Sequence, residues 1–363
     1  MKRYLIYIFC LLFLASFRLN AASEKVSENQ KEINVREIIL SEISDSYEWH
    51  ITTWGEKPIS IPLPIIVHSK TTGWHVFMSS KFKESPVYKG LYIAKEGKYK
   101  DKIVELDKNG KEIRPLDISL TKTATALIFN CILLTTLILS IAHYYKKEGI
   151  FPKKGFVILM EMLIMDIYDN VIKPCIEKDY KRYAPYLLTV FFFIFLNNLL
   201  GLIPFFPFGA TVTGNIAITF TLALCTFLVV NISGTKEYWK GIFWPEVPAW
   251  LKVPIPLMPV VEFIGIFTKP FALMIRLFAN IVGGHSTVGG LVCLIFITVK
   301  LGTTINITMS AISVIFTVFI DLIELLIAYI QAYIFTLLSA LFIGLARVDS
   351  PHKISAVEAT DQV

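Results

Sequence analysis

The segment from Ile305 to Ala346 reads INITMSAISVIFTVFIDLIELLIAYIQAYIFTLLSALFIGLA. It is almost wholly apolar and roughly twice as long as the ~20 residues that one upright membrane span requires. The segment before it, from about Pro254 to Val299, has the same length and character. Such segments must be strongly tilted, extend beyond the bilayer or be broken.

Three shorter apolar segments precede them, and each is long enough to cross a bilayer: Ala124–His143, Tyr186–Phe206 and Ile216–Ile232. If each long segment is one tilted unit, the chain crosses the membrane five times. A hydrophobic content of 54% and a mean hydropathy of +0.59 exclude an ordinary soluble protein of this size. We therefore predict an all-α polytopic membrane protein whose last two helices form a tilted hairpin.

The N-terminal region has a different character. Residues 1–22 combine a basic start, an apolar run and the small residues Ala21 and Ala22, which predicts a secretory signal peptide. An uncleaved membrane anchor is the alternative. Residues 23–118 are polar with alternating stretches such as Trp74–Phe77, which predicts a small exported domain with β structure. Its histidines, His50, His68 and His75, fit no metal-ligand spacing and are expected on a strand face or surface.

The charges predict the orientation. The chain carries a net charge of +6, but its basic residues stand between apolar runs and form no nucleic-acid-binding patch. The joints after the first and third spans contain Lys146, Lys147, Lys153, Lys154, Lys173, Lys178, Lys181, Arg182, Lys236, Lys240 and Lys252. The positive-inside rule places both joints in the cytoplasm. The membrane domain is thus expected at 119–347, with a cytoplasmic tail at 348–363. Within the first joint, 155–176 predicts a helix along the membrane interface.

Ionisable residues collect in the last two segments, where their burial in lipid is costly and indicates a function. The first segment has Glu262, Lys269, Arg276, Asn280 and His285, and the second has Asp321, Glu324 and Gln331. Helical geometry places the first four residues on one stripe and directs His285 elsewhere. Glu324 and Gln331 share a stripe on the last helix.

The chemistry of these groups differs. A guanidinium does not deprotonate in proteins, so Arg276 is suited to holding a carboxylate ionised. His285 and Glu324 are suited to passing protons. Two simpler interpretations stay open: Arg276 and Glu324 form an ion pair that locks two helices, and Lys269 extends along the helix toward the interface.

The stretch KPFALMIRLFAN at 269–280, followed by Gly283-Gly284-His285, resembles the hallmark helix of ATP synthase subunit a. Residues 330–338 (IQAYIFTLL) resemble the last-helix motif of that family, and 197–204 (NNLLGLIP) resemble its second-span signature. The resemblance covers roughly residues 119–347. Ala272 and Ala279 depart from the family pattern, which often has a hydroxyl residue and a glycine there, and Thr211, Thr213 and Asn215 stand for its hydroxyl and acidic pattern before the third span.

The resemblance implies a stator that couples proton flow to rotation. Arg276 corresponds to the arginine that faces the carboxylates of the rotating c-ring and prevents a direct leak. His285 and Glu324 match the titratable positions of the outer half-channel, and Asn280 and Gln331 match polar residues beside the arginine. Glu262 matches a carboxylate near the cytoplasmic exit. The implied partners are the c-ring, subunit b of the peripheral stalk, protons and lipid.

No cofactor, metal or nucleic acid is expected. The chain has no phosphate-binding loop of the Walker type, so the ATP chemistry is expected in partner subunits. A proton-coupled secondary transporter is the main alternative, but we find none of the internal repeats that are typical of such proteins. A third interpretation is a structural assembly protein, but such a protein has no function for ionisable residues within apolar helices.

Overall fold

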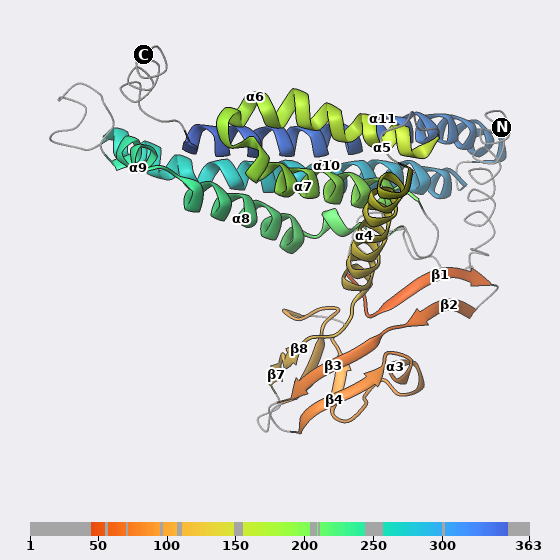
Figure 1. Ribbon diagram of the computed structural model, residues 1–363. Coiled ribbons are helices and arrows are strands. Elements are labelled where there is room, and N and C mark those ends of the chain that lie inside the picture. The colour runs from red at the N-terminus through yellow and green to blue at the C-terminus, as the bar shows by residue number, and fades with distance from the viewer. Residues whose placement is uncertain are drawn as a thin grey trace, which may run out of the picture. The chain divides into compact units, whose positions relative to one another are not determined.

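The computed structural model describes residues 45–54, 57–69, 72–94, 97–106, 111–148, 155–203, 209, 211–243, 257–299 and 302–347 (Figure 1). The chain divides into a strand-rich unit, Met1–Phe129 with Leu200–Val212, and a helical unit, Asn130–Leu199 with Thr213–Val363. The predicted signal peptide at 1–22 and the predicted tail at 348–363 lie outside the described residues.

Three small antiparallel sheets form the strand-rich unit. The first pairs β1 (Glu48–Trp54) with β2 (Lys57–Pro62). The second has the order β4-β3-β8 and the third the order β5-β6-β7. Their strands are β3 (Pro64–Ser69), β4 (Gly73–Met78), β5 (Leu91–Ile93), β6 (Ile103–Leu106), β7 (Glu112–Ile113) and β8 (Leu116–Asp117), and the short helix α3 spans Lys81–Glu84. The predicted N-terminal β structure is confirmed.

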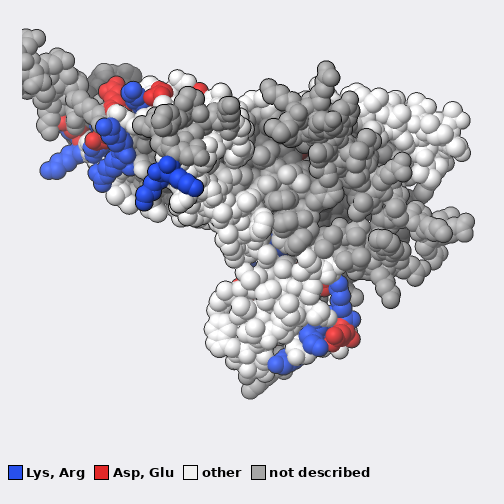
Figure 2. All heavy atoms as spheres, turned by 45° about the vertical axis from the view of Figure 1, so that its right-hand side comes forward, with Lys and Arg blue, Asp and Glu red and all other residues white. Residues whose placement is uncertain are grey.

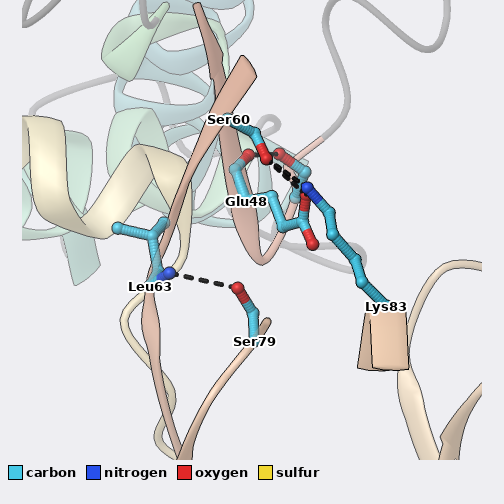
Figure 3. Close-up of polar contacts among 6 residues, drawn as sticks. Glu48, Ser60, Leu63, Ser79 and Lys83 are labelled. Carbon is cyan, nitrogen blue, oxygen red and sulfur yellow. Dashed lines mark hydrogen bonds and ion pairs between the residues drawn. The ribbon is translucent and has the colours of Figure 1, made fainter. Parts of the chain in front are cut away.

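The alternation along β3 produces the core of this unit. Ile65 and Val67 point inward and pack with Leu91 and Ile103 from the third sheet. Figure 3 shows how polar contacts join the strands to α3: Glu48 accepts a hydrogen bond from Ser60 and pairs with Lys83 at 2.9 Å. The backbone N–H of Leu63 donates to the Ser79 hydroxyl at 3.1 Å (Figure 3).

Two histidines of this unit, His68 and His75, have structural neighbours. His68 meets the Trp74 ring edge-on at 4.8 Å, and His75 lies 2.7 Å from the Thr72 hydroxyl. No group of three or more His, Cys, Asp or Glu residues in the described part of the chain is arranged to hold a metal ion.

Helix α4 (Lys122–Glu148) starts from a polar anchor on the strand-rich unit. Asp45 Oδ1 accepts hydrogen bonds from the Thr123 N–H at 3.0 Å and from its hydroxyl at 2.9 Å. The N–H of Lys122 donates to the Ser46 carbonyl at 2.8 Å. These bonds satisfy helix N–H groups that have no partner inside the helix.

The helical unit continues with α5 (Phe156–Ile167), a π-helical turn (Tyr168–Ile172), α6 (Lys173–Ile176), α7 (Tyr180–Gly201), α8 (Ile216–Ser233), α9 (Lys236–Phe243), α10 (Leu257–Thr298) and α11 (Thr303–Arg347). Among the described residues five helices, α4, α7, α8, α10 and α11, are long and apolar enough to cross a membrane. This confirms the five predicted segments. Helix α7 begins at Tyr180, earlier than expected, and includes Pro185.

Helices α10 and α11 are unbroken over 42 and 45 residues and lie side by side as an antiparallel hairpin (Figure 1). Pro270 lies inside α10 without ending it. The core of the helical unit combines large apolar side chains from several helices, including Phe191 of α7, Leu277 of α10 and Phe335 of α11. The predicted long C-terminal hairpin is therefore confirmed.

Several helix ends meet at one end of the helical unit. The Thr235 N–H, between α8 and α9, donates to the Ala346 carbonyl near the end of α11 at 3.0 Å. Arg347 pairs with Asp179, which follows α6. Lys, Arg, Asp and Glu gather at one end of the unit on the face that Figure 2 shows. Residues from the joints after the first and third spans, Asp179 and Thr235, thus contact the end of α11.

Candidate functional site

Arg276 lies in the middle of α10 and is exposed. Three neighbours on the same helix face, Ala272, Ala279 and Gly283, are small and also exposed, and Asn280 stands beside them. A Cβ added to Gly283 would meet no atom within 4 Å. No described residue forms an ion pair with the guanidinium. The Arg276 guanidinium therefore stands on a helix face with several small side chains, and another helix can approach this face closely.

Asn280 and Gln331 form the polar link between the two helices of the hairpin. The Asn280 side-chain amide donates to the Gln331 Oε1 at 2.7 Å, and Gln331 is 2% exposed. A buried amide needs such a partner because an unpaired polar group in the interior is costly. The sequence placed Asn280 and Gln331 on polar stripes of two different helices, and the packing of α10 against α11 brings the two side chains into contact.

Glu324 is buried against α10, with 9% of its surface exposed. Its carboxyl group packs on Gly284 so closely that a Cβ at this glycine would collide with it. His285 follows directly and is half-buried, so the acid and the histidine lie at the same level of the hairpin.

This level differs from the level of Arg276, which lies about two helical turns before Gly284. Arg276 and Glu324 do not form an ion pair among the described residues, and the Oε1 atom of Glu324 has no hydrogen-bond partner. The interpretation of these two residues as a simple interhelical lock is therefore wrong.

Glu262 and Lys269 lie in the first part of α10 and are half-buried. The Lys269 ammonium lies 5.7 Å from the centre of the Phe342 ring. Lys269 also lines a small cavity of about 30 Å³ together with Tyr238 and Asn231. Burial, and next to it the nearby Glu262 carboxylate, raise the pKa of Tyr238 on α9.

The predicted stripe holds because α10 is one continuous helix. Glu262, Lys269 and Arg276 follow each other at intervals of two turns on its surface. The contact of Lys269 with Phe342 of α11 is compatible with both interpretations, an extension along the helix and a direct role.

Neutral polar pairs in the helical unit were not predicted from the sequence. Asn130 of α4 donates to Asn197 of α7 at 2.8 Å, and Thr213 donates to Asn198 at 2.7 Å. The sequence signal is the presence of amide side chains within apolar runs. Pairing across helices depends on register, which spacing along one segment does not give.

Comparisons with known proteins show the family of the chain. The family model "ATP synthase A chain" matches residues 124–344, and a domain of unknown function (DUF8433) matches residues 38–121. ATP synthase subunit a of Chloroherpeton thalassium is 41% identical over 249 residues, which cover 66% of this chain and 70% of that protein.

Two further relatives are ATP synthase subunit a of Chlorobium phaeobacteroides and of Myxococcus xanthus. The first is 43% identical over 242 residues, or 65% of this chain and 67% of the relative. The second is 41% identical over 242 residues, or 65% of this chain and 76% of the relative. The chain therefore belongs to the ATP synthase A chain family, as a multi-pass membrane subunit of the F-type ATP synthase complex.

Proposed function

We propose that this chain is the stator half of a proton turbine, in which two offset aqueous half-channels open onto the c-ring. A proton enters from outside, neutralises a carboxylate of the ring, travels with the ring and leaves to the cytoplasm. One charge moved through 100 mV yields about 2.3 kcal/mol, so several protons must be combined through rotation for each ATP. The chain carries the proton step and no ATP chemistry.

The observation that carries this proposal is the exposed Arg276 among small residues on α10. An exposed guanidinium within an apolar span requires an anionic partner, because a lone charge in lipid is costly. A carboxylate on a neighbouring ring helix supplies that partner. The close approach that Ala279 and Gly283 permit brings the two charges into contact. Because arginine keeps its proton, the contact holds the carboxylate ionised and blocks a direct leak.

The buried residues supply the outer half-channel. Glu324 and His285 pass protons between outside water and the ring, while the Asn280–Gln331 bond holds the two helices in register beside the arginine. Glu262 lies toward the other end of α10 and serves the cytoplasmic exit. Tyr238, close to Glu262, lies near the same exit.

The orientation follows from the charges. Because residues of both lysine-rich joints, Asp179 and Thr235, contact the end of α11, we place this end in the cytoplasm and the mature N-terminus outside. Residues 23–118 are then an exported domain and 1–22 its signal peptide. The c-ring and subunit b of the peripheral stalk are the proposed partners within the membrane.

Disulfide cross-linking tests the c-ring contact. Ala279→Cys is paired with a cysteine placed beside the membrane carboxylate of subunit c, in a chain whose own cysteines are replaced by serine. We expect oxidation to yield an a–c product. The matched control is Ile281→Cys, which lies at the same depth but on a different, half-buried face. Equal cross-linking of both variants, or of neither in the assembled complex, would contradict the proposal.

A further inference from the structure

A stripe of hydroxyl and carboxyl side chains follows one face of α11 toward its N-terminal end. Ser313, Thr317 and Glu324 are 1%, 6% and 9% exposed, and the half-buried Asp321 stands between the last two. Intervals of four, four and three residues keep all of them on one face of a helix. Polar side chains in this pattern are unusual in a span whose other faces are apolar.

Two buried polar atoms of the stripe lack a hydrogen-bond partner. The hydroxyl oxygen of Ser313 and the Oε1 atom of Glu324 are buried and have no hydrogen-bond partner. Buried polar groups in native proteins are satisfied by protein or by water. Since water fits beside polar groups that have unused hydrogen-bonding capacity, the two ends of this stripe are suited to hydration.

The register of the hairpin places a glycine-containing part of α10 at this level. Two contacts set the register of the hairpin: Gly284 against Glu324, and the Thr298 hydroxyl to Asn306 at 3.0 Å. Residues 287–294 of α10 therefore lie at the level of 313–321. This part of α10 contains Gly289 and Gly290, and a Cβ added to Gly290 would meet no atom within 4 Å.

We propose that Ser313, Thr317 and Asp321 line a hydrated path along α11, and that Asp321 is a proton-relay residue that feeds Glu324. The proposal rests on the proposed function and assigns residues to its outer half-channel. Hydronium in the path gives a proton to the Asp321 carboxylate, which becomes a carboxylic acid. The acid then releases this proton through a bridging water to the Glu324 carboxylate, and Asp321 is a carboxylate again. One turn separates the two residues, roughly 4.5 Å along the axis, a gap that one water bridges.

The relay is tested by ATP-driven proton pumping in inverted vesicles that contain the whole complex. Asp321→Asn keeps the size of the side chain but cannot carry the proton, so we expect pumping to fall about tenfold or more. Asp321→Glu restores the carboxyl group and is expected to recover most of the rate. Co-purification with the c-ring establishes assembly of both variants. Wild-type pumping by Asp321→Asn, or failure of Asp321→Glu to exceed it, would overturn the relay.

The path is tested by thiol labelling from outside in intact cells, with a small, charged reagent that does not cross membranes. In a chain whose own cysteines are replaced by serine, we expect Ser313→Cys and Thr317→Cys to react. The matched control is Leu322→Cys, whose side chain is 62% exposed on an apolar face and is expected to resist. Resistance of Thr317→Cys equal to that of Leu322→Cys would contradict the path.

The outcomes separate this inference from the function on which it rests. If Arg276→Ala stops pumping while Asp321→Asn does not, the relay is wrong and the stator function stands. If Arg276→Ala pumps normally, the stator function fails and the relay fails with it.

Discussion

Helices α10 and α11 have similar length and composition, yet they place their polar residues differently. On α10, Arg276 is exposed among small residues, whereas on α11 Glu324 and Gln331 are buried against the partner helix. An exposed charge in an apolar span needs a partner from another chain, while buried polar groups need partners inside this one. We infer that α10 meets the moving part of the machine and that α11 serves the fixed proton path.

Among changes to the packing between the two helices, the largest expected effect comes from adding one methyl group at the contact that buries Glu324. In Gly284→Ala the new Cβ collides with the Glu324 carboxyl group and displaces it. Overpacking of this kind costs about 1–3 kcal/mol, and we expect proton pumping to fall roughly tenfold. ATP-driven pumping of the assembled complex is the measurement.

Gly265→Ala is the matched control, because a Cβ at Gly265 meets no atom within 4 Å. It adds the same methyl group to the same helix and is expected to leave pumping unchanged. Equal rates for the two alanine variants would show that the position of the Glu324 carboxyl group does not matter for the proton path.

A smaller effect is expected at the polar link between the helices. Asn280→Leu removes the donor to Gln331 and leaves a buried amide unpaired, at a cost of about 1–3 kcal/mol. Gln331→Leu removes the acceptor. Because both changes break one bond, pumping by the double variant should be no lower than pumping by the worse single variant. If the pumping losses of the two single variants add fully in the double variant, the result would contradict the hydrogen bond between Asn280 and Gln331.

A change in the strand-rich unit is expected to leave pumping unchanged. Tyr47 donates a hydrogen bond to Asp117, and burial, followed by this bond, raises the pKa of the phenol. Tyr47→Phe should cost about 1 kcal/mol of local stability, seen as faster backbone hydrogen exchange at Asp117 in the intact complex.

The pH dependence of this cost has a defined sign. The neutral phenol is the donor, so the bond contributes fully below the unfolded pKa of about 10 and is lost as pH rises through the raised folded pKa. At neutral pH the bond therefore contributes its full stability, and backbone hydrogen exchange at Asp117 should be faster in Tyr47→Phe than in the wild type. A clear loss of pumping in Tyr47→Phe would show that the strand-rich unit takes part in the proton path.

Much of the fold followed from hydropathy and length. The two long helices and the three shorter spans are visible as apolar runs, and α10 continues through Pro270. The start of α7 was less visible, since Lys181 and Arg182 look like part of a joint although they belong to the helix. The π-helical turn at Tyr168–Ile172 has no sequence signal that we used.

The candidate site was predictable along each helix but not between helices. Periodicity placed Arg276 and Asn280 on one stripe, and it placed Glu324 and Gln331 on another. It did not give the register of the hairpin, which depends on close contacts such as Gly284 against Glu324. For the same reason the sequence left open an ion pair between Arg276 and Glu324 that the register excludes. Neutral pairs such as Asn130 with Asn197 depend on register as well.

The most direct test of the central claim is ATP-driven proton pumping in inverted vesicles that contain the Arg276→Ala complex. Loss of a charge partner in a desolvated contact costs about 2–5 kcal/mol, which lowers pumping more than tenfold. The control is Lys146→Ala, which removes an exposed cation near the end of α4 and should leave pumping unchanged. Co-purification with the c-ring establishes assembly of both variants. We predict that pumping is lost in Arg276→Ala alone, whereas wild-type pumping by an assembled Arg276→Ala complex would contradict the role of Arg276 as the ion gate.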